Sequence, residues 1–430
     1  MRSLRIGNGC GFWGDSLDAP VRLAEAGQLD YLTLEYLAEL TMSILALQKQ
    51  RDPNAGYATD FVDLLPRLAP ILERQPNLKI VTNAGGMNPH ACGRKCAALL
   101  PGHRVAVVSG DDLMPRLDEL LAAGHSLAHF DTGESVQTIR GKVVSANAYL
   151  GSAPIADALR LGANVVVTGR VADACLTVGP LLHEFGWTSD DQLAAGTVAG
   201  HLIECGAQVT GGLWMNADDS TRLEDVGYPI AEVREDGTLT ITKPTGSGGA
   251  VNLETVSEQL LYEVADPSRY FTPDVVADFT TVQLRQSAPD AVEVTDSRGR
   301  PATDSYKVSL AYRDGFTAAG TLVFAGPHAV RNARRSGEIL LARLKQAGIE
   351  CEHSLIEVIG EGSPVTLRVA VRDARKSHVE RFTKEFAPLV TSGYAGTTGY
   401  TTGRASVREV FAYWPALIAK SAVTPKVELL

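Results

Sequence analysis

The segment 168–173, TGRVAD, places an arginine and a carboxylate directly after a short apolar run at 164–168. Arginine can hold a carboxylate or a phosphate through two parallel hydrogen bonds, and buried charges of this kind cluster at functional sites. The β-branched run stops at Gly169 and a helical pattern follows, so a strand, a tight turn and a helix are expected. We predict that Arg170 and Asp173 bind substrate; the alternative is an ion pair that only fixes the turn.

A second polar group lies further along, where His201, Glu204 and Cys205 are spaced by three and four residues. Such spacing puts side chains on one face of a helix. We predict His201 and Glu204 as catalytic residues, because an imidazole and a carboxylate can both move a proton. The spacing supplies only part of a metal-ligand set, so no metal ligand is assigned, and a divalent metal is not excluded. The alternative is a histidine that only caps or pairs.

Two carboxylates follow the first two apolar runs. Asp15 ends the segment GNGCGFWGD (7–15), and Glu35 opens EYLAE (35–39). Carboxylates brought together without cations force one of them to keep its proton, which makes a general acid, although a divalent ion is an equal reason for gathering them. We predict Asp15 and Glu35 as catalytic and Asn8 as substrate-binding. The alternatives are solvated acids at helix starts and turn glycines, since 7–15 lacks the third glycine of a dinucleotide fingerprint.

Asparagine side chains and glycines follow two other apolar runs, in NAGGMNP (83–89) and NAYLG (147–151). Amide groups both donate and accept hydrogen bonds, so they suit a carboxylate, a hydroxyl or an oxyanion that forms during reaction. The alternative for 83–89 is an Asn-capped turn before a helix that begins near Pro89. The substrate-binding residues predicted here are Asn83, Gly85, Gly86, Asn88 and Asn147.

Two glycine-rich segments mark the second half of the chain, TGSGGAVN (245–252) and SGYAGTTGYTTGR (392–404). Their backbone amides could wrap a phosphate, and neither is a Walker A loop because the GK[ST] ending is missing. Flexible hairpin loops are the alternative. The predicted contacts to a phosphate of coenzyme A are Gly246, Gly248, Gly249, Gly396, Gly399 and Arg404.

Strand-like apolar runs alternate with helical patterns through the first half, which predicts βαβ units and a mostly parallel sheet covered by helices. The strand-like runs are 4–6, 31–34, 78–82, 105–109, 143–146 and 165–168. The helical patterns include 37–48, 61–74, 113–122, 155–161 and 176–185. A polar or glycine-rich loop follows each of the six runs, so we expect these loops to converge on the carboxyl edge of the sheet, where α/β folds keep their sites.

The composition changes at 215–225, MNADDSTRLED, which is typical of a solvated linker. Beyond it, alternating apolar runs are interspersed with helical patterns at 253–264, 333–344 and 377–386. The predicted fold is therefore an α/β N-terminal domain, residues 1–222, with a mostly parallel sheet covered by helices. An α+β domain with a mixed sheet follows at residues 223–430.

Composition limits the classes of partner. A net charge of −10 without a basic cluster argues against nucleic acid and anionic membranes, and no segment has the roughly 18 apolar residues of a bilayer span. The N-terminus lacks the apolar region of a signal peptide, and six scattered cysteines do not form a disulfide framework. We expect a cytoplasmic protein with reduced thiols and a small-molecule substrate; the sequence leaves open whether it forms a homo-oligomer.

The segments above resemble the acyclic terpene utilisation (AtuA) family. Matching pieces run in order through nearly the whole chain and include GNGCGFWGD, IVTNAGGMNP, GANVVVTGRVADACL, GHLIECGAQVTGG and TGSGGAVNLETVSEQLL. The resemblance implies a place in bacterial degradation of citronellol and geraniol through branched acyl-CoA intermediates. Longer relatives carry an additional small C-terminal domain that resembles a ferredoxin fold, so that unit is expected to be absent or supplied by a separate small protein. The resemblance carries over no catalytic residue.

These observations predict an enzyme of carboxylic acid or acyl-CoA catabolism, a lyase or hydratase acting on a branched hydroxyacyl substrate by acid–base chemistry. Arg170 would hold the acid group, Asn83 and Asn88 would stabilise an enolate oxygen, and other side chains would move the proton: Glu35, Asp15 or His201. Coenzyme A would enter as part of the substrate. The alternatives are a non-catalytic subunit of a complex with a small ferredoxin-fold partner, and a nucleotide- or coenzyme A-binding enzyme of another class.

Overall fold

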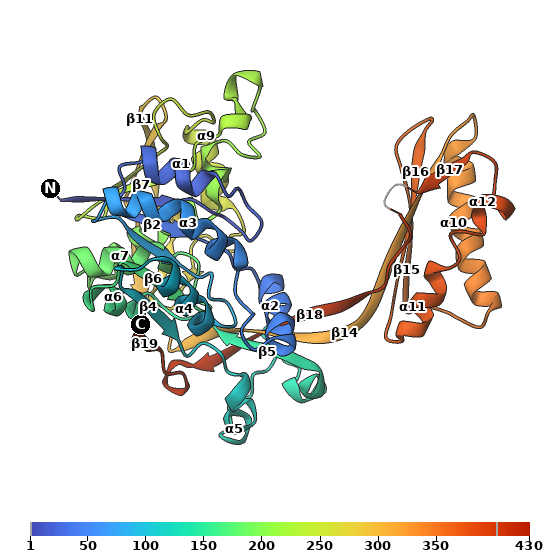
Figure 1. Cartoon of the computed structure of the whole chain (residues 1–430), viewed down its shortest axis with the longest axis horizontal. Coiled ribbons are helices and arrows are strands. Elements are labelled where there is room, and N and C mark those ends of the chain that lie inside the picture. The colour runs from blue at the N-terminus through green and yellow to red at the C-terminus, as the bar shows by residue number, and fades with distance from the viewer. Residues whose placement is uncertain (1, 401–402) are drawn as a thin grey trace. The chain divides into compact units, whose positions relative to one another are not determined.

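The computed structural model of the protein describes residues 2–400 and 403–430. The chain forms two compact units (Figure 1). The first comprises Met1–Arg140, Val144–Ala311 and Tyr413–Leu430, and the second comprises Gly141–Val143 and Tyr312–Ala412. In the sequence, the second unit is thus an insertion into the first. The units differ in extent from the sequence domains 1–222 and 223–430, and that domain boundary stays a prediction.

Five parallel strands form the centre of the sheet in the first unit. In spatial order they are β1 (Ser3–Asn8), β2 (Tyr31–Leu34), β3 (Lys79–Thr82), β6 (Val165–Thr168) and β4 (Val105–Ser109). Every residue of β2 and β6 is buried, as expected for strands that are covered on both faces. The predicted α/β fold with a mostly parallel sheet is confirmed.

Antiparallel strands extend this sheet at both edges to ten strands. Beyond β1 lie β7 (Ile230–Arg234), β8 (Leu239–Thr242), β12 (Ala291–Thr295) and β11 (Gln283–Ala288). Beyond β4 lies β19 (Lys426–Leu429). A separate three-stranded sheet contains β13 (Arg298–Pro301), β10 (Val275–Asp278) and β9 (Tyr270–Phe271). Segments from the second half of the sequence therefore complete the sheet begun by the first half.

Helices cover both faces of the central strands. Leu32 and Leu34 of β2 pack in a core cluster with α1 (Ala19–Ala26), α3 (Thr59–Arg74) and α4 (Pro89–Leu99). Alternate residues of a strand face opposite sides, and Tyr31 donates a 2.8 Å hydrogen bond to Glu184 near the end of α7 (Cys175–Phe185). Helix α7 packs against α6 (Ala153–Arg160) and α8 (Asp190–Glu204). The other α-helices of this unit are α2 (Glu39–Arg51), α5 (Leu117–Ala122) and α9 (Leu253–Leu261).

One strand prediction needs a correction. The run at 143–146 forms β5 (Val143–Ala148), but β5 pairs with β14 (Ser305–Phe324) and does not join the parallel sheet. The physical reason is that the outer edge of β4 is already occupied by β19. An isolated bridge between Asp112 and Asn147 still brings the end of β5 against the loop after β4. Five of the six polar loops therefore follow parallel strands. The sixth, which follows β5, reaches the same region through the bridge between Asp112 and Asn147.

The second unit has a βαββαβ order, the ferredoxin-like arrangement. Its elements are β14, α10 (Ala329–Gln346), β15 (His353–Ile359), β16 (Val365–Asp373), α11 (Lys376–Thr383) and β17 (Thr397–Tyr400), with sheet order β15-β16-β14-β17. Short α12 (Leu389–Ser392) precedes β17, and β18 (Arg408–Ala419) also pairs with β14. Alternate residues of β16 are buried, which places one face on the core. This confirms the predicted α+β character of the later part of the chain.

The chain itself contains a unit of this ferredoxin-like topology, within Tyr312–Ala412. This unit does not test the expectation about the additional C-terminal domain of longer relatives. A separate small ferredoxin-fold protein stays a prediction.

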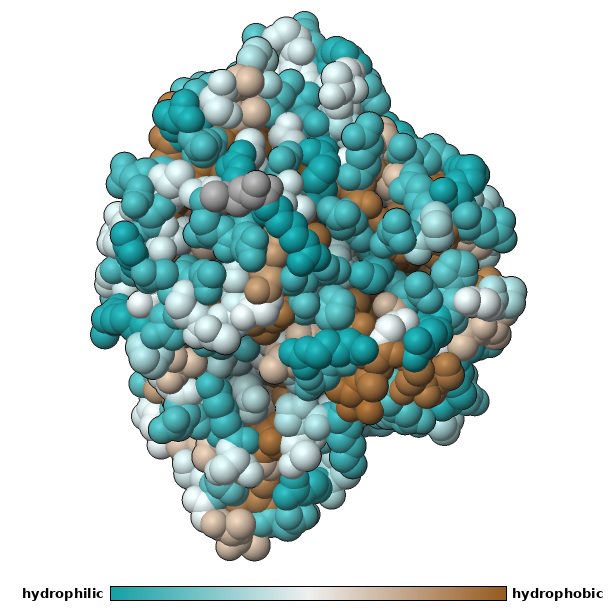
Figure 2. Space-filling model, turned by 90° about the vertical axis from the view of Figure 1, so that its left-hand side faces the viewer, coloured by the Kyte–Doolittle hydropathy of each residue, from teal (hydrophilic) through white to brown (hydrophobic). Residues whose placement is uncertain are grey.

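Among the described residues, no helix combines the length and apolar character that a bilayer span requires. The face drawn in Figure 2 is mainly hydrophilic, with apolar side chains in separate groups.

Phe61 on α3 provides a test of this core. Its side chain is fully buried in the cluster that joins α3 to the sheet, so Phe61→Ala should lower the free energy of unfolding by about 3–5 kcal/mol in urea denaturation. Phe130→Ala makes the same change at a side chain that is 64% exposed, and it should shift stability by no more than about 0.5 kcal/mol. Equal losses in both variants would contradict the packing described for α3.

Candidate functional site

A cleft of about 490 Å³ opens in the first unit where β1, β2 and β6 end and the C-terminal end of α8 approaches them. Its polar lining consists mostly of carboxylates. Five of the predicted site residues line it: Asp15, Glu35, Arg170, Asp173 and Glu204. Residues that the sequence prediction did not assign also line it, among them Glu39, Cys205, Tyr228, Tyr262 and Glu263. The structure thus brings together side chains from both halves of the sequence.

Arg170 is held at this edge by a set of directional contacts. Its side chain is 2% exposed, and its Nη1 donates to the Leu37 carbonyl at 3.1 Å and to Asp173 Oδ1 at 2.7 Å. The guanidinium carbon lies 4.1 Å from the centre of the Tyr149 ring. Burial opposes its charge, but the nearby anions, Asp173 first, outweigh this and raise the pKa of Arg170. The cation is therefore permanent, and its Nε has no hydrogen-bond partner among the described residues.

The turn that carries Arg170 depends on Gly169 and Asp111. A Cβ on Gly169 would lie 2.3 Å from Asp111 Oδ1, so only glycine fits this approach. Asp111 Oδ2 accepts hydrogen bonds from the Arg170 amide at 2.9 Å and from Asn147 Nδ2 at 2.8 Å. Burial raises the pKa of Asp111 to about 6. Asn147 consequently supports the turn through Asp111 and does not line the cleft.

Glu35 is a buried carboxyl group with one oxygen engaged. Its Oε1 accepts hydrogen bonds from the Leu37 amide at 3.0 Å and from Asn83 Nδ2, while its Oε2 has no hydrogen-bond partner. Burial raises the pKa of Glu35 well above its usual range, and the charge of Asp173 adds to the increase. Asn83 Oδ1 also accepts from the Tyr36 amide at 2.8 Å. Asn83 therefore positions Glu35, and the carboxyl group can serve as a proton donor.

His201 and Glu204 form a buried pair. His201 Nδ1 lies 2.9 Å from Glu204 Oε1, and the imidazole packs against the rings of Tyr270 and Phe279 at centroid distances of 5.3 and 5.2 Å. Burial raises the pKa of Glu204 to about 6, although His201 opposes this. Burial disfavours the charged form of His201, but the charge and hydrogen bond of Glu204, together with its other partners, have the larger combined effect and raise the pKa of His201. Glu204 lines the cleft, whereas His201 is not among the lining residues.

A second charged cluster adjoins Arg170. Tyr149 OH donates to Glu39 Oε1 at 2.7 Å, and Lys307 Nζ lies 3.2 Å from the same oxygen. The centre of the Tyr149 ring lies 4.5 Å from Lys307 Nζ, so two cations contact this ring. Burial opposes the ionisation of Glu39, but Lys307 and Arg170 outweigh it and lower the pKa to about 2. The sequence signal for Tyr149 was the polar NAYLG loop; Lys307, in β14, had no sequence signal.

Asp15 and Asn8 are fully engaged with their neighbours. Asp15 accepts from the amides of Gly11 at 2.8 Å and Ser16 at 2.7 Å and from Tyr228 OH at 2.5 Å. Asn8 Nδ2 donates to the carbonyls at the end of α8, at 2.7 Å and 3.0 Å. Asn8 thereby attaches β1 to the helix that carries Glu204. Asp15 lines the cleft and Asn8 does not, and the predicted catalytic role of Asp15 and substrate-binding role of Asn8 stay predictions.

The segment 83–89 forms an Asn-capped turn before α4, which was the alternative to a substrate-binding loop. Asn88 Oδ1 accepts from the Ala91 amide at 3.3 Å as the N-cap of α4, and its Nδ2 donates to the carbonyls of Pro53 and Ala55, both at 2.8 Å. A Cβ on Gly85 would lie 2.4 Å from the Thr168 carbonyl oxygen, and Gly86 has φ of +48°. None of these three residues lines the cleft.

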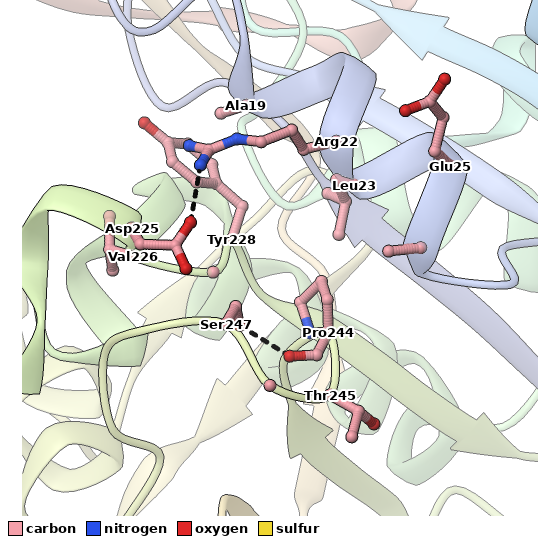
Figure 3. A pocket seen from close by; sticks show the side chains of 13 residues that line it. Ala19, Arg22, Leu23, Glu25, Asp225, Val226, Tyr228, Pro244, Thr245 and Ser247 are labelled. Carbon is pink, nitrogen blue, oxygen red and sulfur yellow. Dashed lines mark hydrogen bonds and ion pairs between the residues drawn. The ribbon is translucent and has the colours of Figure 1, made fainter.

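The glycine-rich segments lie in different units. Gly246 borders a pocket of about 280 Å³ whose Arg22 is paired with Asp225 at 2.9 Å, while Ser247 Oγ donates to the Pro244 carbonyl (Figure 3). Gly248 and Gly249 pass close to the backbone carbonyls of Arg222 and Thr210. In the second unit, Gly396 and Gly399 have positive φ and Arg404 is exposed; residues 401–402 of that segment lie outside the described residues. Phosphate binding by these segments stays a prediction.

Metal binding was left open by the sequence. Across residues 2–400 and 403–430, no three His, Cys, Asp or Glu side chains are grouped so that they could hold a metal ion. The carboxylates of the cleft instead differ in protonation: Glu39 is ionised, while the pKa values of Glu35 and Glu204 are raised. Carboxyl groups whose pKa values differ in this way are typical of acid–base sites.

Comparisons with known proteins give a family. The sequence model described as acyclic terpene utilisation family protein AtuA matches residues 4–429. No curated protein matches the chain. Among solved structures, the chain is similar to the de novo designed protein Ferredog-Diesel, with 19% identity and a TM-score of 0.16. That match covers 23% of this chain and 88% of the designed one, and a TM-score this low supports no further conclusion.

The raised pKa of Glu35 predicts a change in stability with pH. A carboxyl group whose pKa is higher in the folded state loses stability as pH rises above its usual value of 4.5. Glu35→Gln keeps the shape of the protonated form, so its free energy of unfolding should exceed that of the wild type at pH 8 and approach it at pH 5. Glu73→Gln, at an exposed position on α3, should not show this difference. Equal destabilisation by Glu35→Gln at both pH values would mean that Glu35 is ionised in the folded protein.

Proposed function

The chain belongs to the acyclic terpene utilisation (AtuA) family, and we propose that its cleft is the active site of a lyase or hydratase acting on a branched hydroxyacyl substrate. One observation carries the proposal: a buried carboxyl group of raised pKa, Glu35, lies in the same cleft as the permanent cation Arg170. A proton donor beside a fixed positive charge suits the loss of a hydroxyl group from a substrate that carries an acyl oxygen.

Each step of this chemistry has a side chain in the cleft. Arg170 binds the acyl oxygen and stabilises the negative charge that develops on it. Glu204, ionised above about pH 6, takes the proton from the carbon next to the acyl carbon. Glu35 gives its proton to the hydroxyl group, the carbon–oxygen bond breaks, and a carbon–carbon double bond and water form. Proton exchange with solvent then restores both carboxyl groups, and hydration is the reverse reaction.

Two roles differ from those that the sequence suggested. Asn83 and Asn88 were expected to stabilise an enolate oxygen, but Asn83 is engaged by Glu35 and Tyr36, and Asn88 caps α4. We assign the enolate oxygen to Arg170 instead. The carboxylate-rich lining also disfavours a phosphate inside the cleft, because like charges repel. If the substrate is an acyl-CoA, its phosphates therefore lie outside.

Turnover assays test the proposal directly. Purified protein is offered branched 3-hydroxyacyl-CoAs and the free 3-hydroxy acids, and formation of the unsaturated product is followed by mass spectrometry. Glu35→Gln should lower kcat by about 10²–10⁴-fold, because a general acid contributes that much. Glu73→Gln is the matched control and should retain wild-type rates. Wild-type turnover by Glu35→Gln would remove Glu35 from the mechanism, and no turnover of any substrate would refute the proposed reaction class.

The pH profile tests the base. Glu204 must be ionised to accept a proton, so kcat/KM should fall about tenfold per pH unit below about pH 6. His201 lowers the pKa of Glu204, so His201→Gln should move this acid limb to higher pH. His183→Gln, outside the cleft, should leave the limb in place. An acid limb that does not move in His201→Gln would show that Glu204 is not the base.

A further inference from the structure

A second cavity in the first unit has the opposite character to the cleft. Its volume is about 530 Å³, and apolar side chains form most of its lining. Three of them are large and unusually exposed for their type: Phe130 at 64%, Phe271 at 62% and Leu417 at 47%. Exposed apolar side chains gathered around a cavity of this size are typical of a ligand site.

The apolar pocket and the cleft are separated by side chains that contact one another. Tyr149 and Lys307 line the pocket, whereas their partners Arg170 and Glu39 line the cleft. The Tyr149 ring lies 4.1 Å from the Arg170 guanidinium carbon, and its hydroxyl group donates to Glu39 at 2.7 Å. Two consecutive residues also line different cavities: Ala172 lines the pocket and Asp173 lines the cleft. The two cavities therefore adjoin at the contact between Tyr149 and Arg170.

The pocket has few polar groups, and three of them are engaged within the protein. Thr272 Oγ1 donates to the Val275 carbonyl at 2.8 Å, Thr303 Oγ1 donates to the Ser305 carbonyl at 3.3 Å, and Lys307 is paired with Glu39. Lys307 is the only charged residue that lines the pocket in the described chain. A sugar or a nucleotide would find little to bond with here. An aliphatic chain loses no hydrogen bonds in such a lining.

Backbone contacts hold the rim of the pocket in place. The Phe130 amide donates to the Pro415 carbonyl at 2.8 Å, and Lys420 Nζ donates to the Pro273 carbonyl at 2.7 Å. The neighbouring Asp274 accepts from the Ser152 amide at 3.0 Å, which attaches the segment after β9 to the start of α6. The pocket is therefore largely preformed, and filling it requires no ordering of loops.

We propose that this pocket binds the aliphatic chain of the substrate, whose acyl group lies in the cleft beside Arg170. The proposal rests on the proposed function for the position of the acyl group, while the pocket itself defines the ligand class: an aliphatic carboxylic acid or its acyl derivative. Tyr149 and Lys307 are then the positioning residues between the chain and the reacting end. The length of the chain, and not a polar substituent, determines affinity.

Direct binding of a chain-length series tests this site without turnover. Calorimetry with butanoate, hexanoate, octanoate and decanoate should show affinity rising about fourfold per methylene while the chain fills the pocket. Leu417→Asp should weaken decanoate binding at least tenfold. Leu355→Asp is the matched control, since Leu355 is 50% exposed on a strand of the second unit, and it should stay within twofold of the wild type. Circular dichroism checks that both variants are folded.

The outcomes separate this inference from the proposed reaction. Affinity that is independent of chain length, or equal effects of the two leucine variants, would overturn the chain site even if the enzyme turns over hydroxyacyl substrates. Chain-length dependence that is lost in Leu417→Asp would support the site even if no turnover is found. Glu73→Gln, at an exposed position on α3 outside both cavities, should bind decanoate like the wild type.

Discussion

The cleft depends on one buried cation. The Arg170 side chain is 2% exposed, and removing such a charge from water costs several kcal/mol unless partners replace the lost solvation. The Leu37 carbonyl, Asp173 and the face of Tyr149 provide those partners, and Gly169 allows the turn to approach Asp111 closely enough to be fixed. Because each partner comes from a different loop, the position of the guanidinium fixes the positions of the loops around it.

The carboxyl groups around this cation differ because their surroundings differ. Glu39 has two cations nearby, and its pKa falls to about 2 despite burial. Glu35 has an amide and a backbone N–H as partners and the charge of Asp173 nearby, so burial dominates and its pKa rises. The pKa of Glu204 is raised to about 6, because His201 offsets only part of the effect of burial. One local charge arrangement thereby gives three side chains of the same type different pKa values.

The architecture explains how such a site forms from distant segments. The parallel strands bring the polar loops of the first half to one edge, and α8 returns Glu204 to them through the contacts of Asn8. Strand β14 then adds Lys307 from beyond residue 300, before the chain enters the ferredoxin-like unit. The family membership covers all of these segments, residues 4–429. The site and the apolar pocket beside it are therefore products of the whole first unit.

The sequence alone determined the class of the fold, because apolar runs, helical periodicity and loop composition are local properties. The same reasoning found the turn with Arg170 and the paired spacing of His201 and Glu204. Tertiary structure decided the rest. Pairing with β14 removed β5 from the parallel sheet, since β19 already covered β4, and it brought Tyr149 and Lys307 next to Arg170 and Glu39, which line the cleft. Burial and neighbouring charge, which no single segment specifies, determined which carboxyl groups keep their protons.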